Sequence, residues 1–355
     1  MLHSNVFLQY LNDTGSRGHD QFGSVNWLMG MAHRNAGTGQ LMLRGMMSLE
    51  PWTIGGCGYP NLLATGEECE GAAIHDRQHP HDLFMELAAQ YSRPVRGGLH
   101  LQLYGGPVGE PALGPVAFMH RISGVPNPLA PITHHWFDST HITYGVATAG
   151  VFTSKWKLEG SVFNGREPDE DRADFDFGAM DSWSGRVWFM PTSRWALQVS
   201  AGHLTEAEAG HAGGDPRVDV DRVTASATFH RTTLEDTVWA TTVGWGRNSE
   251  SGEGTNALMV ESGLTFRERD ALYGRFEVGQ KSGHDLVVEP EDDIFTVAKL
   301  QGGYTRYLPS WRWWTPGVGA AVSSGIVPQS LATVYGSRVN TGFAAYVTLR
   351  PAARE

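Results

Sequence analysis

The sequence contains no long hydrophobic run, although glycine and aromatic residues are plentiful. Its 355 residues include 44 Gly, 15 Phe and 12 Trp, yet the mean hydropathy is −0.28. A membrane-spanning helix needs about 20 consecutive apolar residues, and no stretch approaches that length. The absence excludes a helical membrane protein. It does not exclude spanning β-strands, which average to near-neutral hydropathy because successive side chains face opposite sides.

Basic residues are also scarce. There are 27 Lys and Arg against 38 Asp and Glu, so the net charge is −11. A nucleic-acid partner is therefore excluded, because such proteins present a basic surface. The sequence has no phosphate-binding glycine loop, no nucleophile-elbow motif and no His-Glu-x-x-His motif. Glycine is instead spread along the chain, where it serves turns, strand kinks and close contacts.

Cysteine occurs only twice, at Cys57 and Cys69. Both fall within one long connecting segment, and in an oxidising compartment we expect them to form a disulfide that closes it. The first residues, Met1 to Ser4, show neither a basic n-region nor an apolar h-region. We expect a signal peptide, with or without a further N-terminal stretch, to precede them in the precursor.

Short segments with period-two alternation run along the entire chain. Each is bounded by turn residues, and together they predict an all-β protein of about sixteen strands. An even number places both termini on the same side. The expected spans are 2–11, 21–33, 39–50, 83–92, 98–105, 140–152, 155–164, 181–190, 195–204, 221–231, 237–247, 256–267, 271–282, 294–307, 312–323 and 337–349.

The two faces of these strands differ in chemistry. In 271–282, Leu272 and Phe276 point to one side, while Arg275 and Glu277 point to the other. We expect the apolar face to meet lipid and the polar face, with charges of both signs, to line an interior that holds water or paired ions. The expected lumen and selectivity residues are Arg44, Glu50, Glu86, His100, Lys157, Glu159, Arg186, Arg222, Arg275, Glu277 and Lys281.

Short and long connections between strands alternate along the chain, and aromatic residues cluster beside the short ones. Trp195 and Phe229 are two examples. This rhythm is typical of an antiparallel transmembrane β-barrel with short periplasmic turns and long extracellular loops. A soluble β-propeller also has alternating strands, but no repeat of blade length is present. The whole of 1–350 is expected to form one barrel domain.

The chain resembles bacterial outer-membrane β-barrels of the porin-like class. The resemblance rests on the connection lengths, on the alternation, and on a final amphipathic strand at 342–349, which is similar to the terminal strand recognised by the outer-membrane insertion machinery. The chain departs from that pattern because Arg350 to Glu355 follow the strand. Its loops are also similar to those of a little-characterised group of outer-membrane proteins, for which the likeness supplies no activity. The resemblance implies a bacterial outer-membrane location and contact with membrane lipid and lipopolysaccharide. It leaves the oligomeric state open, with a homo-oligomer as one alternative.

Histidine is concentrated in and beside two of the long connections, 52–82 and 106–139. Loops of this length usually have a function or fold onto something, and we expect both to fold into or over the lumen. Histidine with nearby carboxylates suits a divalent metal such as zinc, nickel or copper. Alternatively, these side chains only satisfy buried backbone groups of a plug. The candidate metal ligands are His75, His79, His81, Asp82, His134, His135, Asp138 and His141.

Two further chemistries stay open at this point. Ser139 with His141 and Asp138 is one arrangement for a lipid hydrolase of the outer membrane, although the same residues are typical of a turn and cap. The acidic segment 164–172 fits an external calcium or lipopolysaccharide-ion site, or a hydrated loop. A copper path through methionine is weaker, because such residues more often fill space or face lipid. It would use Met29, Met31, Met42, Met46 and Met47.

The favoured function from sequence is a channel that passes small hydrophilic solutes or ions through a polar lumen constricted by the two histidine-rich loops. Divalent-metal binding or transport at those loops is the first alternative, and a lipid-acting hydrolase is the second.

Overall fold

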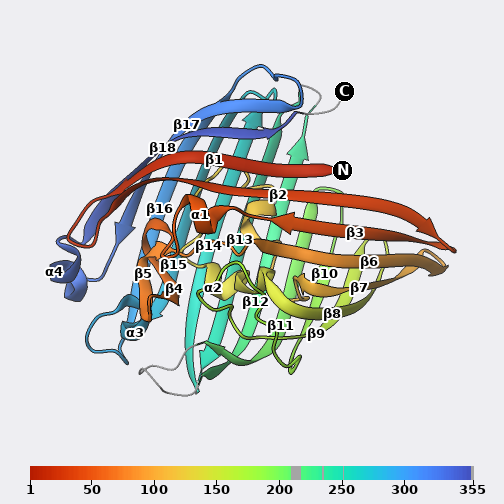
Figure 1. Ribbon diagram of the computed structural model, residues 1–355, viewed down its shortest axis with the longest axis horizontal. Coiled ribbons are helices and arrows are strands. Elements are labelled where there is room, and N and C mark those ends of the chain that lie inside the picture. The colour runs from red at the N-terminus through yellow and green to blue at the C-terminus, as the bar shows by residue number, and fades with distance from the viewer. Residues whose placement is uncertain (209–216, 234–235, 251, 353–355) are drawn as a thin grey trace.

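The computed structural model describes residues 1–208, 217–233, 236–250 and 252–352. Within them, sixteen strands close into one antiparallel barrel, which is sealed where β1 pairs with β18 (Figure 1). The wall strands are β1 (Leu2–Asp13), β2 (Asp20–Ala36), β3 (Gly39–Met47), β6 (Phe84–Arg96), β7 (Leu99–Gly109), β8 (Thr143–Phe152), β9 (Trp156–Phe163), β10 (Ser182–Phe189), β11 (Trp195–Glu208), β12 (Val218–Thr232), β13 (Val238–Glu250), β14 (Glu253–Phe266), β15 (Asp270–Ser282), β16 (Ile294–Tyr307), β17 (Trp314–Ile326) and β18 (Val339–Pro351).

The predicted class, strand number and antiparallel arrangement are confirmed. Two details of the prediction are wrong. The third strand ends at Met47, because Pro51 has no backbone N–H for a ladder and instead occupies the first turn of the short helix α1 (Glu50–Thr53). The alternation of connection lengths is also not strict. β13 and β14 extend beyond their expected spans, so only positions 251 and 252 separate them at the extracellular end, and residue 251 lies outside the described part.

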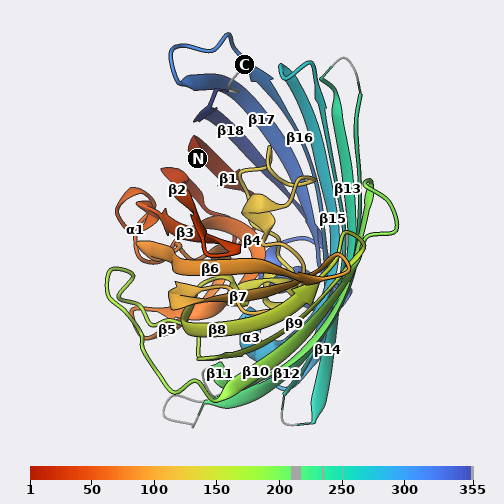
Figure 2. The ribbon, with the colours of Figure 1, turned by 90° about the vertical axis from the view of Figure 1, so that its right-hand side faces the viewer.

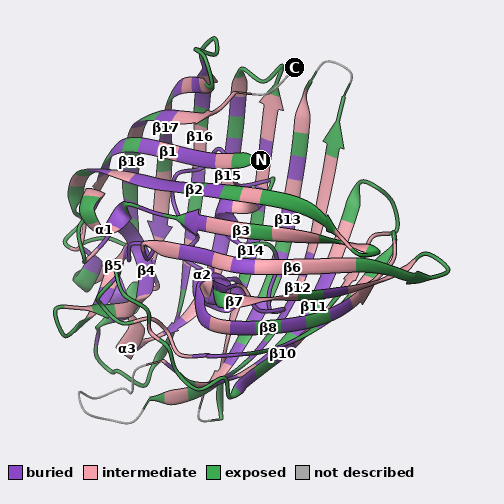
Figure 3. Cartoon of the chain, turned by 45° about the vertical axis from the view of Figure 1, so that its right-hand side comes forward, coloured by how far each residue is buried: buried purple, intermediate pink, exposed green. Residues whose placement is uncertain are grey.

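The strand faces follow the predicted alternation (Figure 3). In β15, Leu272 and Phe276 are exposed, whereas Arg275 and Glu277 are buried inside the barrel. The side chains that point outward therefore form an apolar surface for lipid. Beside the short turns, the Phe229 ring lies 5.1 Å from Trp195 and 5.3 Å from Trp239, measured between ring centroids. These rings belong to the aromatic girdle expected at a membrane interface.

The segments 48–83 and 110–142 pack inside the wall; we call them plug loop 1 and plug loop 2. Figure 2 shows the hairpin of plug loop 1 and the short helices of plug loop 2 within the barrel outline. No described helix is long or apolar enough to span a membrane. The elements off the wall are α1, β4 (Tyr59–Cys69), β5 (Ala72–Gln78), η1 (Phe118–His120), α2 (His134–Phe137), η2 (Ser139–His141), α3 (Gly283–Leu286), η3 (Gln329–Leu331) and α4 (Ala332–Tyr335).

Plug loop 1 is anchored by both apolar packing and a covalent bond. Leu62 and Leu63 of β4 are buried in one cluster with Phe295 and Val297 of β16. A disulfide joins Cys57, which precedes β4, to Cys69, the last residue of β4, with the Cα atoms 5.3 Å apart. Plug loop 1 is therefore packed against the wall, and its strand β4 is cross-linked end to end.

Replacing both cysteines (C57A/C69A) should loosen the hairpin without opening the barrel. Loss of a cross-link over a loop of this size removes about 3 kcal/mol of entropic stabilisation, and the affected residues all lie in plug loop 1. We expect protease nicking within 59–78 in the variant, together with unchanged heat-modifiable migration on SDS gels. Equal protease resistance of variant and parent would contradict this assignment.

Candidate functional site

Charged residues of the wall hold the plug loops in place instead of lining an open path. Arg121 of plug loop 2 donates from Nε to Glu261 Oε1 at 3.0 Å and from Nη1 to Asp138 Oδ2 at 3.3 Å. Glu261 also accepts from Arg275 Nε at 2.7 Å. All four side chains are at most 3 % exposed. Such a network is stable only because each charge is paired and hydrogen-bonded.

Other expected lumen residues also form hydrogen bonds with the plug loops. Lys281 Nζ donates to Thr65 Oγ1 at 2.6 Å, and Arg222 Nη1 donates to Ser139 Oγ at 2.9 Å. Glu277 accepts from the Thr133 hydroxyl at 2.7 Å. Two more bonds to the plug loops run from Lys299 to Leu62 O and from Arg186 to Gly114 O. The pairs Arg186–Glu159, Lys157–Glu159 and Arg44–Glu86 instead join wall residues to one another.

One expected lumen residue does not lie on the wall. Glu50 belongs to α1 and not to the wall, and it is fully buried as the acceptor for His81. His100 stacks on Phe152 with ring centroids 4.9 Å apart, at the ends of β7 and β8 next to the short turns. Periodicity alone placed Glu50 on a strand that in fact ends three residues earlier.

Five of the predicted metal ligands gather between the plug loops; we call them the histidine cluster. It consists of His79, His81, His134, His135 and His141. Successive ring centroids lie 5.4 Å apart for His81 and His141, 5.2 Å for His141 and His134, and 5.5 Å for His134 and His135. His79 lies 6.1 Å from His134 and 6.2 Å from His135. Histidines from two separate loops thus join to make one site.

Hydrogen bonds at Nδ1 fix these rings. His81 Nδ1 lies 2.9 Å from Glu50 Oε2, and His134 Nδ1 lies 2.8 Å from Asp138 Oδ1. His141 Nδ1 lies 2.6 Å from the Asp138 carbonyl oxygen. Donation from Nδ1 leaves the Nε2 lone pair available, which is the arrangement that carboxylates and carbonyls impose on metal-binding histidines. Among the described residues, the buried Nε2 of His141 has no hydrogen-bond partner.

The ionisation of the cluster fits this picture. Burial lowers the pKa of His141 and of His134, so both rings are neutral near pH 7. Burial opposes ionisation of Asp138, but its hydrogen bond with His134 and the charge of Arg121 outweigh burial, and its pKa is lowered. His134 and His141 are therefore neutral imidazoles beside an ionised carboxylate. At His81, by contrast, burial is outweighed by the charge of Glu50, and the pKa is raised.

Two predicted ligands stand apart from the histidine cluster. His75 Nδ1 lies 2.6 Å from Arg17 Nη2 and 3.0 Å from Asp76 Oδ2, on the outer side of the hairpin. Asp82 lies 3.7 Å from Arg172 Nη1. Arg172 also pairs with Glu67 and thereby fastens loop 164–181 over plug loop 1.

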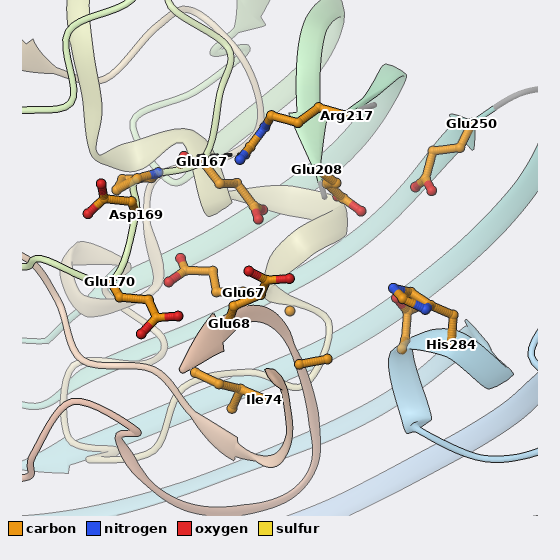
Figure 4. A pocket seen from close by; sticks show the side chains of 14 residues that line it. Glu67, Glu68, Ile74, Glu167, Asp169, Glu170, Glu208, Arg217, Glu250 and His284 are labelled. Atoms are coloured by element: carbon orange, nitrogen blue, oxygen red, sulfur yellow. Dashed lines mark hydrogen bonds between the residues drawn. The ribbon is translucent and has the colours of Figure 1, made fainter. Parts of the chain in front are cut away.

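A cavity of about 210 Å³ opens at the extracellular end between plug loop 1 and the wall. Figure 4 shows Glu67, Glu167 and Glu208 reaching into it from β4, loop 164–181 and β11. Sequence reasoning did not foresee this cavity, because its carboxylates come from segments far apart in the chain. Its other charged residues are Glu68, Asp169, Glu170, Glu250 and Asp285, with Arg217 and His284 as the basic ones.

A second cavity, of about 720 Å³, opens at the opposite end and is lined by residues that include His3, Trp27 and Arg269. In the expected calcium segment and the residues after it, Asp169, Asp174 and Asp176 bring carboxylate oxygens within 4.8 Å of one another. Asp169 and Asp174 are exposed, as a hydrated acidic loop would be.

The structure does not assemble the arrangement that a hydrolase needs. Ser139 Oγ accepts a hydrogen bond from Arg222, and His141 Nδ1 is engaged by the Asp138 carbonyl. No hydrogen bond between Ser139 and His141 occurs in the described part of the chain. A serine nucleophile requires its base within hydrogen-bond reach.

No protein-family model matches the chain, and no curated protein matches it in sequence. Solved structures do. The anion-selective porin from Comamonas acidovorans is 9 % identical with a TM-score of 0.57, covering 99 % of this chain and 98 % of that one. Salmonella typhi OmpF, solved with daunomycin, is 8 % identical with a TM-score of 0.55, covering 99 % and 97 %. Vibrio cholerae OmpT in a trimer form is 9 % identical with a TM-score of 0.52, covering 98 % and 99 %.

This likeness is one of fold. The chain has the sixteen-strand barrel fold of these outer-membrane porins, and identities this low transfer no solute or activity to it.

Replacing Arg121 by Met should release plug loop 2 from the wall, because Glu261 and Asp138 lose a shared buried partner. Breaking a buried pair costs about 3–5 kcal/mol, and we expect the urea midpoint of the folded protein to fall accordingly. We also expect larger and noisier single-channel currents. A matched control is R306A, whose pair with Asp270 is exposed and partly open to water; it should change neither quantity. Unchanged stability in R121M would show that the network does not hold the loop.

Proposed function

We propose that this protein is an outer-membrane channel that passes small cations through a lumen constricted by the two plug loops. The observation that supports this proposal is the acidic cavity at the extracellular end. Eight of its lining residues are Asp or Glu, against one Arg and one His. Carboxylates crowded in a low-dielectric recess attract cations and repel anions. The fold supports the proposal because the same sixteen-strand wall encloses the lumen in porins.

The constriction lies beneath this cavity. Plug loop 2 places the histidine cluster and Phe118 across the lumen, with Phe118 stacked 5.8 Å from His81 between centroids. The proposed path thus runs from an attractive acidic entrance to a narrower nitrogen-lined section, and the passage of large solutes is disfavoured.

Divalent-metal transport is the second candidate. The buried nitrogen lone pairs of the histidine cluster favour it, since a channel for alkali cations alone has no need of imidazole at its narrowest part. Expected contacts with lipid and lipopolysaccharide follow from the apolar belt. We also propose a homo-oligomer, by analogy with the trimer form of Vibrio cholerae OmpT, to be tested by chemical cross-linking in membranes.

Neutralising the cavity should reduce cation preference. We expect E208Q/E250Q to move the reversal potential in a tenfold KCl gradient toward zero, with the cation-to-anion permeability ratio falling several-fold. The measurement is made in planar bilayers at about 0.1 M salt, where the Debye length is about 10 Å.

The matched control is E289Q/E291Q, which removes two carboxylates of loop 283–293 that do not line the cavity. A similar shift in both double variants would assign selectivity to general rim charge. A parent protein without conductance would remove the proposal.

A further inference from the structure

We infer that His135, Glu167 and Glu208 form a binding site for a divalent cation of the zinc class at the inner side of the extracellular cavity. The inference rests on the proposed function in one respect: the bound cation is taken to be the one that enters the channel. Binding itself can be measured whether or not ions pass.

The first support is the convergence of three ligands from three separate elements. His135 comes from α2, Glu167 from loop 164–181 and Glu208 from the end of β11. Their ligand atoms all lie within 4.8 Å of one another. Ligands about 2.0–2.2 Å from a tetrahedral zinc lie roughly 3.4 Å apart, so small side-chain rotations would close the site. Three protein ligands leave the fourth position open to water.

The second support is independent of the carboxylates. His135 is 9 % exposed, and its Nε2 has no hydrogen-bond partner among the described residues. Its Nδ1 lies 3.1 Å from Glu167 Oε1, which orients the ring and leaves the second carboxylate oxygen for a cation. A buried nitrogen without a partner costs free energy, and a bound cation would remove that cost.

Gly66 lies between the His135 ring and the cavity. This residue lines the cavity, and a Cβ built on it would overlap His135 Nε2. Its backbone φ of +107° also favours glycine. The ring can therefore pack directly behind the cavity wall only because position 66 carries no side chain.

The surrounding charge selects for a cation, and the ligand types select its class. Glu68, Glu250 and Asp285 line the same cavity. One imidazole and two carboxylates match zinc-class ions. An imidazole ligand disfavours calcium, and the absence of sulfur among the three ligands disfavours Cu(I).

The site also adjoins the histidine cluster. His135 contacts His134 and His79 through its ring, so a cation released inward meets further imidazoles at once. The exposed carboxylates of 169–176 differ in this respect, because their group among the described residues contains no histidine.

The test uses the full-length folded protein in detergent, freed of metal with EDTA. Zn²⁺ is titrated by calorimetry, and Co²⁺ is titrated by visible absorption as a report on imidazole and carboxylate ligands. The variants are H135A and E208Q. Their matched controls are H203A and E206Q. His203 lies on the same strand, β11, and pairs with Asp221. Glu206 lies two positions before Glu208 and pairs with Arg166. Heat-modifiable migration verifies folding of each.

We expect one tight Zn²⁺ equivalent in the parent, a dissociation constant raised tenfold or more in H135A and E208Q, and less than threefold changes in both controls. Absence of stoichiometric zinc, or equal binding in H135A, E208Q and the parent, overturns the site. Conductance recorded on the same preparations separates the two proposals. Zinc binding by a silent barrel overturns only the channel, whereas a conducting barrel that binds no zinc overturns only the site.

Discussion

The arrangement of this molecule depends on the buried network in which Arg121 bridges Glu261 of the wall and Asp138 of plug loop 2. The polar lumen of a barrel normally holds water, and a loop that enters it must replace that water with equally good partners. Here Glu261 of the wall pairs with both Arg121 of the plug and Arg275 of the wall, so none of these charges is left unpaired. Because Asp138 also fixes His134, the same network that holds the loop orients the histidine cluster.

The wall could be read from sequence with accuracy because a strand in a barrel obeys a single rule. Side chains such as Leu272 and Arg275 alternate between lipid and lumen along the whole strand, and each connection ends at turn residues. The rule fails where the chain leaves the wall. Glu50 continues the alternation of its strand, yet Pro51 directs the chain into a helix, so periodicity placed Glu50 on the wall incorrectly.

The site was predictable in type but not in membership. The density of histidine in two loops indicated where a site would form, and five of those histidines do lie together. Glu167 was noted only as part of an acidic loop, and Glu208 not at all. Nothing local distinguishes Glu208 from Glu206 two residues earlier. The ladder of β11 is irregular between Leu204 and Glu208, and Glu206 has a φ of +50°, so Glu208 faces the cavity while Glu206 pairs with Arg166.

The dependence of wall cations on the plug has a consequence for the empty barrel. Arg275, Lys281, Lys299 and Arg222 all donate to neutral carbonyl or hydroxyl oxygens or amides of the plug loops. Without those loops, Lys281, Lys299 and Arg222 would lose these oxygen partners and face open water, whereas Arg275 would keep Glu261 of the wall. A wide pore made by deleting the plug would therefore differ from the native lumen in more than diameter, because cations that the plug now covers would line it.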